Sequence, residues 1–161
     1  MFVPFNTLPD SSKVWIYEAN REFKATEVEK IDQLLTEFVS GWKRHGEDLR
    51  ASYKLLYNQF VILAVDESYQ EVSGCSIDAS VAIIKQLQEA LQVDLLNKMQ
   101  VTFKDGDNIN TVSLKDFKEY ARQQKINGST VVFNNLVRSK GELESSWETR
   151  ASQSWHAKFL V

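Results

Sequence analysis

The chain has 161 residues, of which 19 are Lys or Arg and 22 are Asp or Glu, so its formal net charge is -3. A weakly acidic chain without a basic cluster is a poor partner for nucleic acid, because neutralising phosphates requires a local excess of Lys and Arg. One cysteine excludes an intrachain disulfide, and the longest apolar run, residues 60–65, is far shorter than the roughly 20 residues of a membrane helix. Because the N-terminus also lacks a signal-peptide pattern, we expect a cytoplasmic protein with no membrane insertion.

The first strand and helix are indicated by a change in hydrophobic period. Residues 13–17 alternate as a strand does, and Thr26 with Glu29 forms a capping box that predicts the start of a helix. Apolar residues then recur at helical spacing as far as Trp42. The basic run 43–45 and Gly46 favour a helix end there, because cations and a left-handed glycine suit the C-terminus of a helix.

The middle of the chain predicts a hairpin and a second helix. Residues 51–57 and 60–65 are strand-like and are separated by Asn58-Gln59. The second of these runs is apolar on both faces, which indicates a central strand that is covered on both sides. Residues 73–76 (Ser-Gly-Cys-Ser) lead into the second helix, with Ser76 as its expected N-cap.

The last third of the chain predicts another hairpin and two more helices. Residues 99–104 and 109–113 flank Asp105-Gly106, which is a strong signal for a short hairpin. A third helix, which Ser113 with Asp116 can cap, follows as far as Asn127-Gly128, and residues 130–133 form a further strand. A closing helix then begins at Ser139, with an apolar stripe that consists of Leu143, Trp147, Ala151, Trp155 and Phe159.

These elements predict an α+β fold. The first six run strand, helix, strand, strand, helix, strand, which is the order of the ferredoxin-like split βαβ core. We expect the first and third strands to be parallel neighbours in the middle of its sheet. The added hairpin strand, helix, strand and closing helix complete the chain, and a three-layer α/β arrangement is the alternative. Because no linker or repeat divides the chain, residues 1–161 are expected to form a single domain.

Several chemical motifs are absent from the sequence. No Gly-Lys pair and no G-x-G-x-x-G occur, so the chain lacks a phosphate-binding loop and is not expected to be a self-sufficient ATPase. The segment 105–108 begins like a calcium loop, but Ile109 and Asn110 stand where an oxygen ligand and a glycine are required. One cysteine and two histidines do not provide a zinc site. We therefore expect no metal and no cofactor.

One group of residues is a candidate ligand site. If the first and third strands are parallel, their ends lie at the same edge of the sheet, beside the N-termini of both helices. Free amides and the helix dipole at such a place favour an anion or a thiolate. The predicted ligand-binding residues are Asn20, Arg21, Asp66, Ser73, Gly74, Ser76 and Asp78, and Cys75 is the candidate catalytic residue.

The same residues also have an ordinary structural interpretation. Gly74 allows a turn, Ser76 caps a helix, Asp78 complements the helix dipole, and Cys75 is a small, partly buried side chain. In the catalytic interpretation, the helix N-terminus and Arg21 lower the pKa of the Cys75 thiol and make it nucleophilic.

A base for such a thiol is also available in the sequence. His156 would accept its proton, and Asn134 or Asn135 would orient the imidazole. Sequence alone leaves open whether His156 or Asn134 approaches Cys75, and a histidine on a helix surface is the simpler interpretation.

Several segments together resemble a small family of uncharacterised bacterial proteins commonly labelled ABC-transporter ATPases. The label implies nucleotide hydrolysis, but the missing phosphate-binding loop contradicts it, so no catalytic residue is carried over. What the resemblance implies is a bacterial, cytosolic setting and attention to the loop 73–78. The segments that carry it are 14–17, 20–23, 56–68, 73–78, 132–137 and 154–156.

Three functions remain as hypotheses. The first is a non-enzymatic cytosolic protein that binds a small anionic ligand or a protein partner. The second is a thiol-dependent enzyme that uses Cys75 as its nucleophile. The third, which rests only on the family label, is a soluble accessory protein of a transporter. The sequence does not specify the oligomeric state.

Overall fold

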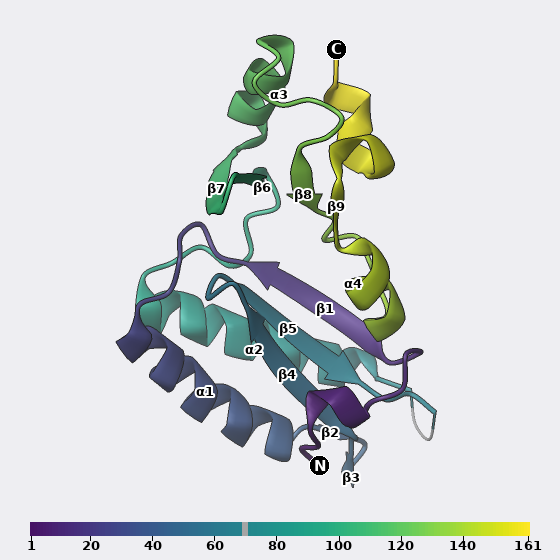
Figure 1. Cartoon of the computed structure of the whole chain (residues 1–161). Coiled ribbons are helices and arrows are strands. Elements are labelled where there is room, and N and C mark those ends of the chain that lie inside the picture. The colour runs from purple at the N-terminus through teal and green to yellow at the C-terminus, as the bar shows by residue number, and fades with distance from the viewer. Residues whose placement is uncertain (69–70) are drawn as a thin grey trace. The chain divides into compact units, whose positions relative to one another are not determined.

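A computed structural model of the chain describes residues 1–68 and 71–161 and has the mixed α+β architecture expected from the sequence (Figure 1). The chain forms two compact units. Unit 1 consists of Met1–Leu96 and Arg138–Gly141, and unit 2 of Asn97–Val137 and Glu142–Val161. The single-domain organisation stays a prediction. Within the described ranges, no helix combines the length and hydropathy that a membrane span requires.

The sheet of unit 1 has three strands, β1 (Lys13–Glu18), β4 (Ala51–Leu56) and β5 (Phe60–Val65), in the order β1-β5-β4. The strand β5 is antiparallel to both neighbours. Strands β1 and β4 therefore run in the same direction, with β5 inserted between them. The short 3-10 helix η1 (Phe5–Thr7) contacts β4.

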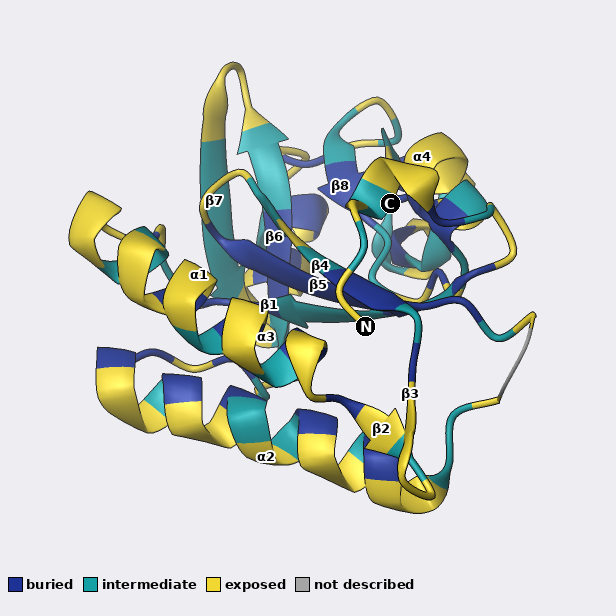
Figure 2. Cartoon of the chain, turned by 90° about the horizontal axis from the view of Figure 1, so that it is seen from below, coloured by how far each residue is buried: buried dark blue, intermediate teal, exposed yellow. Residues whose placement is uncertain are grey.

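The prediction that residues 60–65 form a central strand buried on both faces is confirmed. All six residues of β5 are completely buried, and its ribbon is dark along its whole length in Figure 2. Because alternate side chains of a strand point to opposite faces, burial of all six means that both faces of the sheet are covered at its centre.

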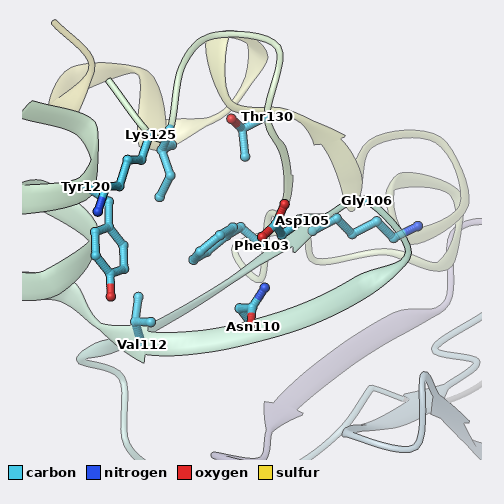
Figure 3. A pocket seen from close by; sticks show the side chains of 10 residues that line it. Phe103, Asp105, Gly106, Asn110, Val112, Tyr120, Lys125 and Thr130 are labelled. Atoms are coloured by element: carbon cyan, nitrogen blue, oxygen red, sulfur yellow. The ribbon is translucent and has the colours of Figure 1, made fainter. Parts of the chain in front are cut away.

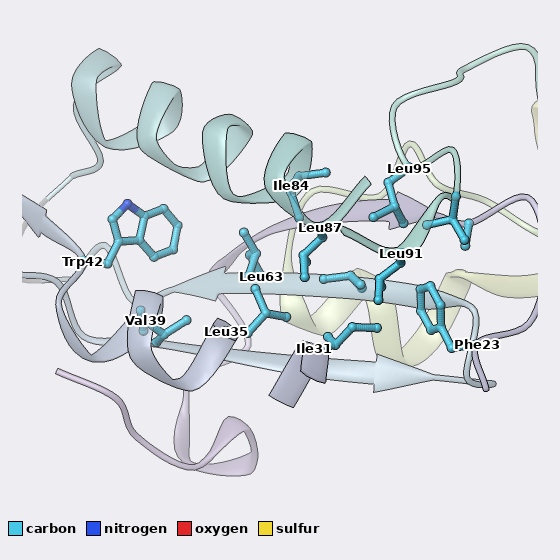
Figure 4. Close-up of a cluster of buried hydrophobic side chains, with 14 of the residues drawn as sticks. Phe23, Ile31, Leu35, Val39, Trp42, Leu63, Ile84, Leu87, Leu91 and Leu95 are labelled. Carbon is cyan, nitrogen blue, oxygen red and sulfur yellow. The ribbon is translucent and has the colours of Figure 1, made fainter. Parts of the chain in front are cut away.

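Helices α1 (Ala25–Ser40) and α2 (Gly74–Leu91) cover one face of this sheet (Figure 4). Both helices direct an apolar stripe at the strand β5, as the spacing of their apolar residues predicts. The buried side chains that meet there are Ile31, Leu35 and Val39 from α1, Ile84, Leu87 and Leu91 from α2, and Val61, Leu63 and Val65 from β5.

The ends of α1 differ from the prediction. The helix begins at Ala25, where the backbone N–H of Lys24 donates a hydrogen bond of 2.8 Å to Glu27 Oε1. It ends at Ser40, and the basic run instead forms a two-residue strand in a small hairpin, β2 (Lys43–Arg44) with β3 (Glu47–Asp48). His45 and Gly46 both have a left-handed backbone, with φ of 49° and 81°. This is the geometry of a tight hairpin turn, so Gly46 turns a hairpin and does not end a helix.

The expected ferredoxin-like sheet is not formed as predicted. Strands β1 and β5 are neighbours, but they are antiparallel and not parallel. The reason is that α1 connects β1 to β4 as a crossover between parallel strands, and the tight β4–β5 turn then makes the inserted strand β5 antiparallel to both. The fourth expected strand, β6 (Gln100–Asp105), belongs to a different sheet. The outer edge of β1 is instead bridged at Lys13 by Ser139.

The sheet of unit 2 has the order β7-β6-β8-β9, with β7 (Asn108–Ser113), β8 (Val131–Phe133) and β9 (Glu148–Arg150). The predicted β6–β7 hairpin is confirmed, and Gly106 takes a φ of +62° in its two-residue turn. Helix α3 (Leu114–Arg122) follows at once and is capped by Ser113, whose Oγ accepts the N–H of Asp116 at 3.0 Å. A buried cluster closes this unit and consists of Val101, Phe117, Ile126, Val132 and Ala151.

Both predicted helix ends in unit 2 are wrong. Helix α3 stops at Arg122 because Gln124 is left-handed, with φ of 60°, and the N–H of Lys125 then bonds the carbonyl of Tyr120 at 2.9 Å. The closing helix is broken into α4 (Lys140–Ser146), β9, η2 (Ala151–Gln153) and η3 (Trp155–Phe159). It breaks because the backbone of β9 pairs with β8, which overrides the helical period of the side chains.

Truncation of Leu63 to alanine is expected to lower the free energy of unfolding by about 2–5 kcal/mol, because a fully buried leucine leaves a cavity between the sheet and both helices. Urea unfolding followed by circular dichroism measures this loss. The matched control is Leu55→Ala on β4, whose side chain is only half-buried and whose loss is expected to be smaller. Equal losses for the two variants would contradict the central role of β5.

Candidate functional site

The residues predicted to form one site lie at two opposite ends of the unit 1 sheet. Because β1 and β5 are antiparallel, Glu18 at the end of β1 pairs with Phe60 at the start of β5, whereas Val65 pairs with Lys13. Asn20 and Arg21 therefore follow β1 at one end. The other predicted residues, which are Asp66, Ser73, Gly74, Cys75, Ser76 and Asp78, follow β5 or start α2 at the other end.

The guanidinium of Arg21 is hydrogen-bonded to other groups of unit 1. It donates to both carboxylate oxygens of Glu27 at 2.8 and 2.9 Å, and to the carbonyl of Leu91 at 3.1 Å, at the C-terminal end of α2. The hydrogen bond from Arg21, assisted by that from the Lys24 N–H, lowers the pKa of Glu27 to about 2. Nearby, the Asn20 side-chain oxygen accepts the N–H of Asp94 at 2.9 Å. These polar groups connect α1 to the end of α2.

At the opposite end of the sheet, most of the predicted residues form hydrogen bonds with neighbouring groups of unit 1. Asp66 is buried, and its Oδ1 accepts the N–H of Ser68 at 2.9 Å. Ser73, not Ser76, is the N-cap of α2, because its Oγ accepts the N–H of Ser76 at 3.2 Å. Ser76 is buried in the first turn, where its Oγ donates to the Lys43 carbonyl at 2.7 Å. It therefore fixes the start of α2 to the β2–β3 hairpin.

Gly74, Cys75 and Asp78 are exposed on the first turns of α2. Cys75 is a free thiol at the surface, so the interpretation of Cys75 as a partly buried side chain is wrong. Arg21 is bonded to the carbonyl of Leu91, at the other end of α2 from Cys75. The 16 residues between Cys75 and Leu91 separate the two positions by about 24 Å, at a helical rise of 1.5 Å per residue. The expectation that Arg21 lies within reach of the thiol is therefore wrong.

His156 is a buried packing residue of unit 2. It is fully buried, its Nδ1 lies 2.8 Å from Ser154 Oγ, and its ring stacks on Trp155 at 3.8 Å between centroids. Burial lowers the pKa of His156 to about 4, so the imidazole is neutral at pH 7. Its Nε2 has no hydrogen-bond partner among the described residues. An enclosed ring of this kind cannot serve as the base for a thiol at the surface.

The two asparagines suggested as its orienters have other roles. Asn134 Oδ1 accepts the N–H of Leu136 at 3.1 Å in a turn, and Asn135 Oδ1 accepts the indole N–H of Trp147 at 2.8 Å. Neither contact involves His156, so the residues suggested for a catalytic triad do not form one.

Unit 2 contains a groove that no pattern in the sequence indicates (Figure 3). Its volume is about 400 Å³, which is within the range of small-molecule sites. The walls come from the β6–β7 hairpin, from α3 and from the segment after α3. The residues that line it are Phe103, Lys104, Asp105, Gly106, Asn110, Val112, Tyr120, Lys125, Ile126 and Thr130.

The groove combines aromatic faces with cations. Lys125 Nζ lies 5.7 Å from the centre of the Tyr120 ring, and no ion pair of Lys125 is found within the described chain. Lys104 also lines the groove and is paired with Glu148 at 2.9 Å. The left-handed Gln124 places Lys125 at this position, because it turns the chain back over the last turn of α3. No motif marks these residues, which explains why the sequence pattern did not reveal them.

A second hollow, of about 330 Å³, includes the predicted site residue Asn20. It lies where the end of α2 meets the loop after β1. Glu89 and Asp94 contribute two carboxylates to its lining, and none of the described residues that line it is a Lys or Arg. Because like charges repel, this hollow is unsuited to the anion for which Asn20 was proposed.

Among the described residues, no group of three or more His, Cys, Asp or Glu side chains is arranged to hold a metal ion. No model of a known protein family matches the chain, and no curated protein or solved structure matches it significantly. The resemblance to the bacterial family labelled as transporter ATPases therefore stays a prediction.

The substitution Arg21→Ala is expected to leave the alkylation rate of Cys75 by iodoacetamide unchanged at every pH. At about 24 Å the charge is screened, since the Debye length is about 8 Å at physiological ionic strength. The measurement is the rate of iodoacetamide labelling against pH in both proteins, with unfolded protein as the reference for a fully free thiol. A slower rate in the variant would show that the two groups are coupled after all.

Acidification is expected to destabilise the protein through His156. The unfolded chain takes up a proton near the ordinary pKa of 6.5, whereas the folded chain does so only near 4, so the unfolded state binds more protons between these values. The contribution of neutral, buried His156 to the free energy of unfolding is complete above pH 6.5. It is lost as the pH falls, and about 3 kcal/mol has been lost at pH 4.

Urea unfolding at a series of pH values, compared between the natural chain and His156→Phe, isolates this contribution, because phenylalanine keeps the ring but cannot be protonated. An unchanged profile in His156→Phe would contradict the prediction.

Proposed function

We propose that this protein is a non-enzymatic binding protein and that the groove of unit 2 holds a small organic anion with a flat ring. The observation that carries the proposal is the position of Lys125, a cation without an ion-pair partner among the described residues, beside the Tyr120 ring at the groove wall. A flat ring would lie against Phe103 and Tyr120, and its negative group would meet the Lys125 ammonium.

The polar residues of the groove favour a ligand with one negative charge. Asn110 and Thr130 line the groove and supply amide and hydroxyl groups that donate or accept hydrogen bonds. Asp105 contributes a carboxylate to the lining, and Glu148 already neutralises Lys104. A ligand with several negative charges would be repelled by the Asp105 carboxylate and would meet only one lysine without an ion-pair partner among the described residues, so a monocarboxylate is a better fit than a polyphosphate.

A binding role is better supported than a catalytic role. The thiol-enzyme hypothesis depended on Arg21 as an activating cation and on His156 as a base, but Arg21 is bound to Glu27 and His156 is enclosed in unit 2. Cys75 retains only an exposed position on the first turn of α2. The accessory role in a transporter rests on the family label alone. A cytosolic location is part of this proposal, and the free cysteine is compatible with it.

Benzoate and its neutral analogue benzamide test the proposal. In nuclear magnetic resonance titrations of the full chain, we expect benzoate to shift the amide signals of β6, β7 and residues 125–130, with a Kd of about 1 mM. Benzamide is expected to bind more weakly, because it lacks the charge that pairs with Lys125.

The variant Lys125→Met removes the charge and keeps most of the length of the side chain. It is expected to weaken benzoate binding about tenfold and to leave benzamide binding unchanged. The matched control is Lys118→Met on α3, whose Nζ lies over the Phe159 ring at 4.9 Å and outside the groove lining. Benzoate shifts at other positions, or equal effects of the two substitutions, would contradict the proposed site.

A further inference from the structure

One wall of the unit 2 groove is a face of the β6–β7 hairpin. Because alternate residues of a strand point to the same face, Asp105 shares the face of β6 that carries Val101 and Phe103. Val101 belongs to the buried cluster of unit 2, and Phe103 packs against this cluster. The register of the hairpin places Asn110 opposite Phe103 and therefore on the same face. The strand thus directs the Asp105 side chain to the groove, in agreement with its place in the lining.

The Asp105 carboxylate makes no hydrogen bond and no ion pair with the described residues of the chain. Lys125, beside the Tyr120 ring, is likewise without an ion pair among those residues. Lys104 differs from both, because it is paired with Glu148 at 2.9 Å. Within the described chain, the groove therefore presents one positive and one negative side chain that are available to a ligand.

These two charges lie on different sides of the Phe103 ring. Figure 3 shows Lys125 and Tyr120 on one side of this ring and the Asp105 carboxylate on the other. A flat ring that lies against Phe103 would hold two substituents apart in the same way. A ligand with a negative group at one end of its ring and a positive group at the other would match both side chains.

We propose that the groove is a site for an aromatic amino carboxylate, whose carboxylate and protonated amine lie at opposite ends of the ring. This inference rests on the proposed function, in which a carboxylate meets the Lys125 ammonium. It adds a second group to the ligand, an ammonium that donates hydrogen bonds to the Asp105 carboxylate. A purely anionic ligand lacks this contact and is repelled by Asp105.

The size of the effect follows from the position of Asp105 at the surface. Its side chain is exposed, so water and salt screen its attraction for an ammonium. An ion pair of this kind strengthens binding by about threefold, and a second carboxylate on the ligand weakens it by a similar factor. Asp105 therefore adjusts the choice among ligands that Lys125 and the aromatic rings already hold.

The test compares three benzoates that differ only in the group opposite the carboxylate. These are 4-(aminomethyl)benzoate, 4-(hydroxymethyl)benzoate and terephthalate, in which that group is positive, neutral and negative. In nuclear magnetic resonance titrations of the full chain, we expect the affinity to fall in this order, by about threefold at each step. The amide signal of Gly106, which adjoins Asp105, is expected to respond most to the amine.

The variant Asp105→Asn removes the charge and keeps the size of the side chain. It is expected to weaken 4-(aminomethyl)benzoate and to strengthen terephthalate, each about threefold, and to leave 4-(hydroxymethyl)benzoate unchanged. A general distortion of the groove would not move two ligands in opposite directions. The matched control is Asp107→Asn, which removes an exposed carboxylate of the same turn outside the groove lining and is expected to preserve the order.

Phenylalanine tests the separation of the two charges, because its ammonium adjoins its carboxylate. It is expected to bind no more tightly than 4-(hydroxymethyl)benzoate, and tighter binding than 4-(aminomethyl)benzoate would overturn the proposed arrangement. Equal affinities of the three benzoates, or equal effects of the two variants, would also overturn it. If benzoate still shifts the groove signals in that case, the proposed function stands without this inference. If neither benzoate nor its derivatives shift those signals, the proposed function fails and this inference fails with it.

Discussion

Complete burial of β5 between β1 and β4 is the constraint on which unit 1 depends. A strand with six buried apolar side chains requires a neighbour on each side and a cover on each face. The neighbours are its hairpin partner β4 and the strand β1, and both are antiparallel to it. The same pairing sends the end of β1 and the end of β5 to opposite edges of the sheet. The antiparallel pairing of β5 with β1 therefore stabilises the core and also separates the residues that the sequence predicts to form one site.

Most polar residues of the expected site close the ends of helices. Arg21 and Glu27 connect the start of α1 to the last carbonyl of α2. At the start of α2, Ser73 accepts a backbone N–H of the helix, and Ser76 bonds to the β2–β3 hairpin. A helix end leaves backbone groups without partners, so such side chains are needed even in a protein without a site nearby. A cluster of capping residues therefore resembles an anion site in sequence, although its hydrogen-bonding capacity is already used.

Two interruptions of regular structure shape unit 2, which contains the groove of the proposed binding role. The left-handed Gln124 ends α3 early and brings Lys125 over Tyr120, which forms one wall of the groove. The pairing of β9 with β8 interrupts the closing helix, and His156 packs against Phe117 in the interior at 5.5 Å between ring centroids.

The sequence alone determined the local features whose causes lie within a few residues. The hairpin turns at Asn58 and Gly106, the cap at Ser113 and the central burial of β5 were all predictable, because turn chemistry, capping and an unbroken apolar run act over short distances. Only the tertiary structure decided the direction of β1 relative to β5, the break in the closing helix and the position of Lys125 beside Tyr120. These depend on which distant backbone edges pair, and backbone hydrogen bonds form between strands without leaving a residue pattern in either strand.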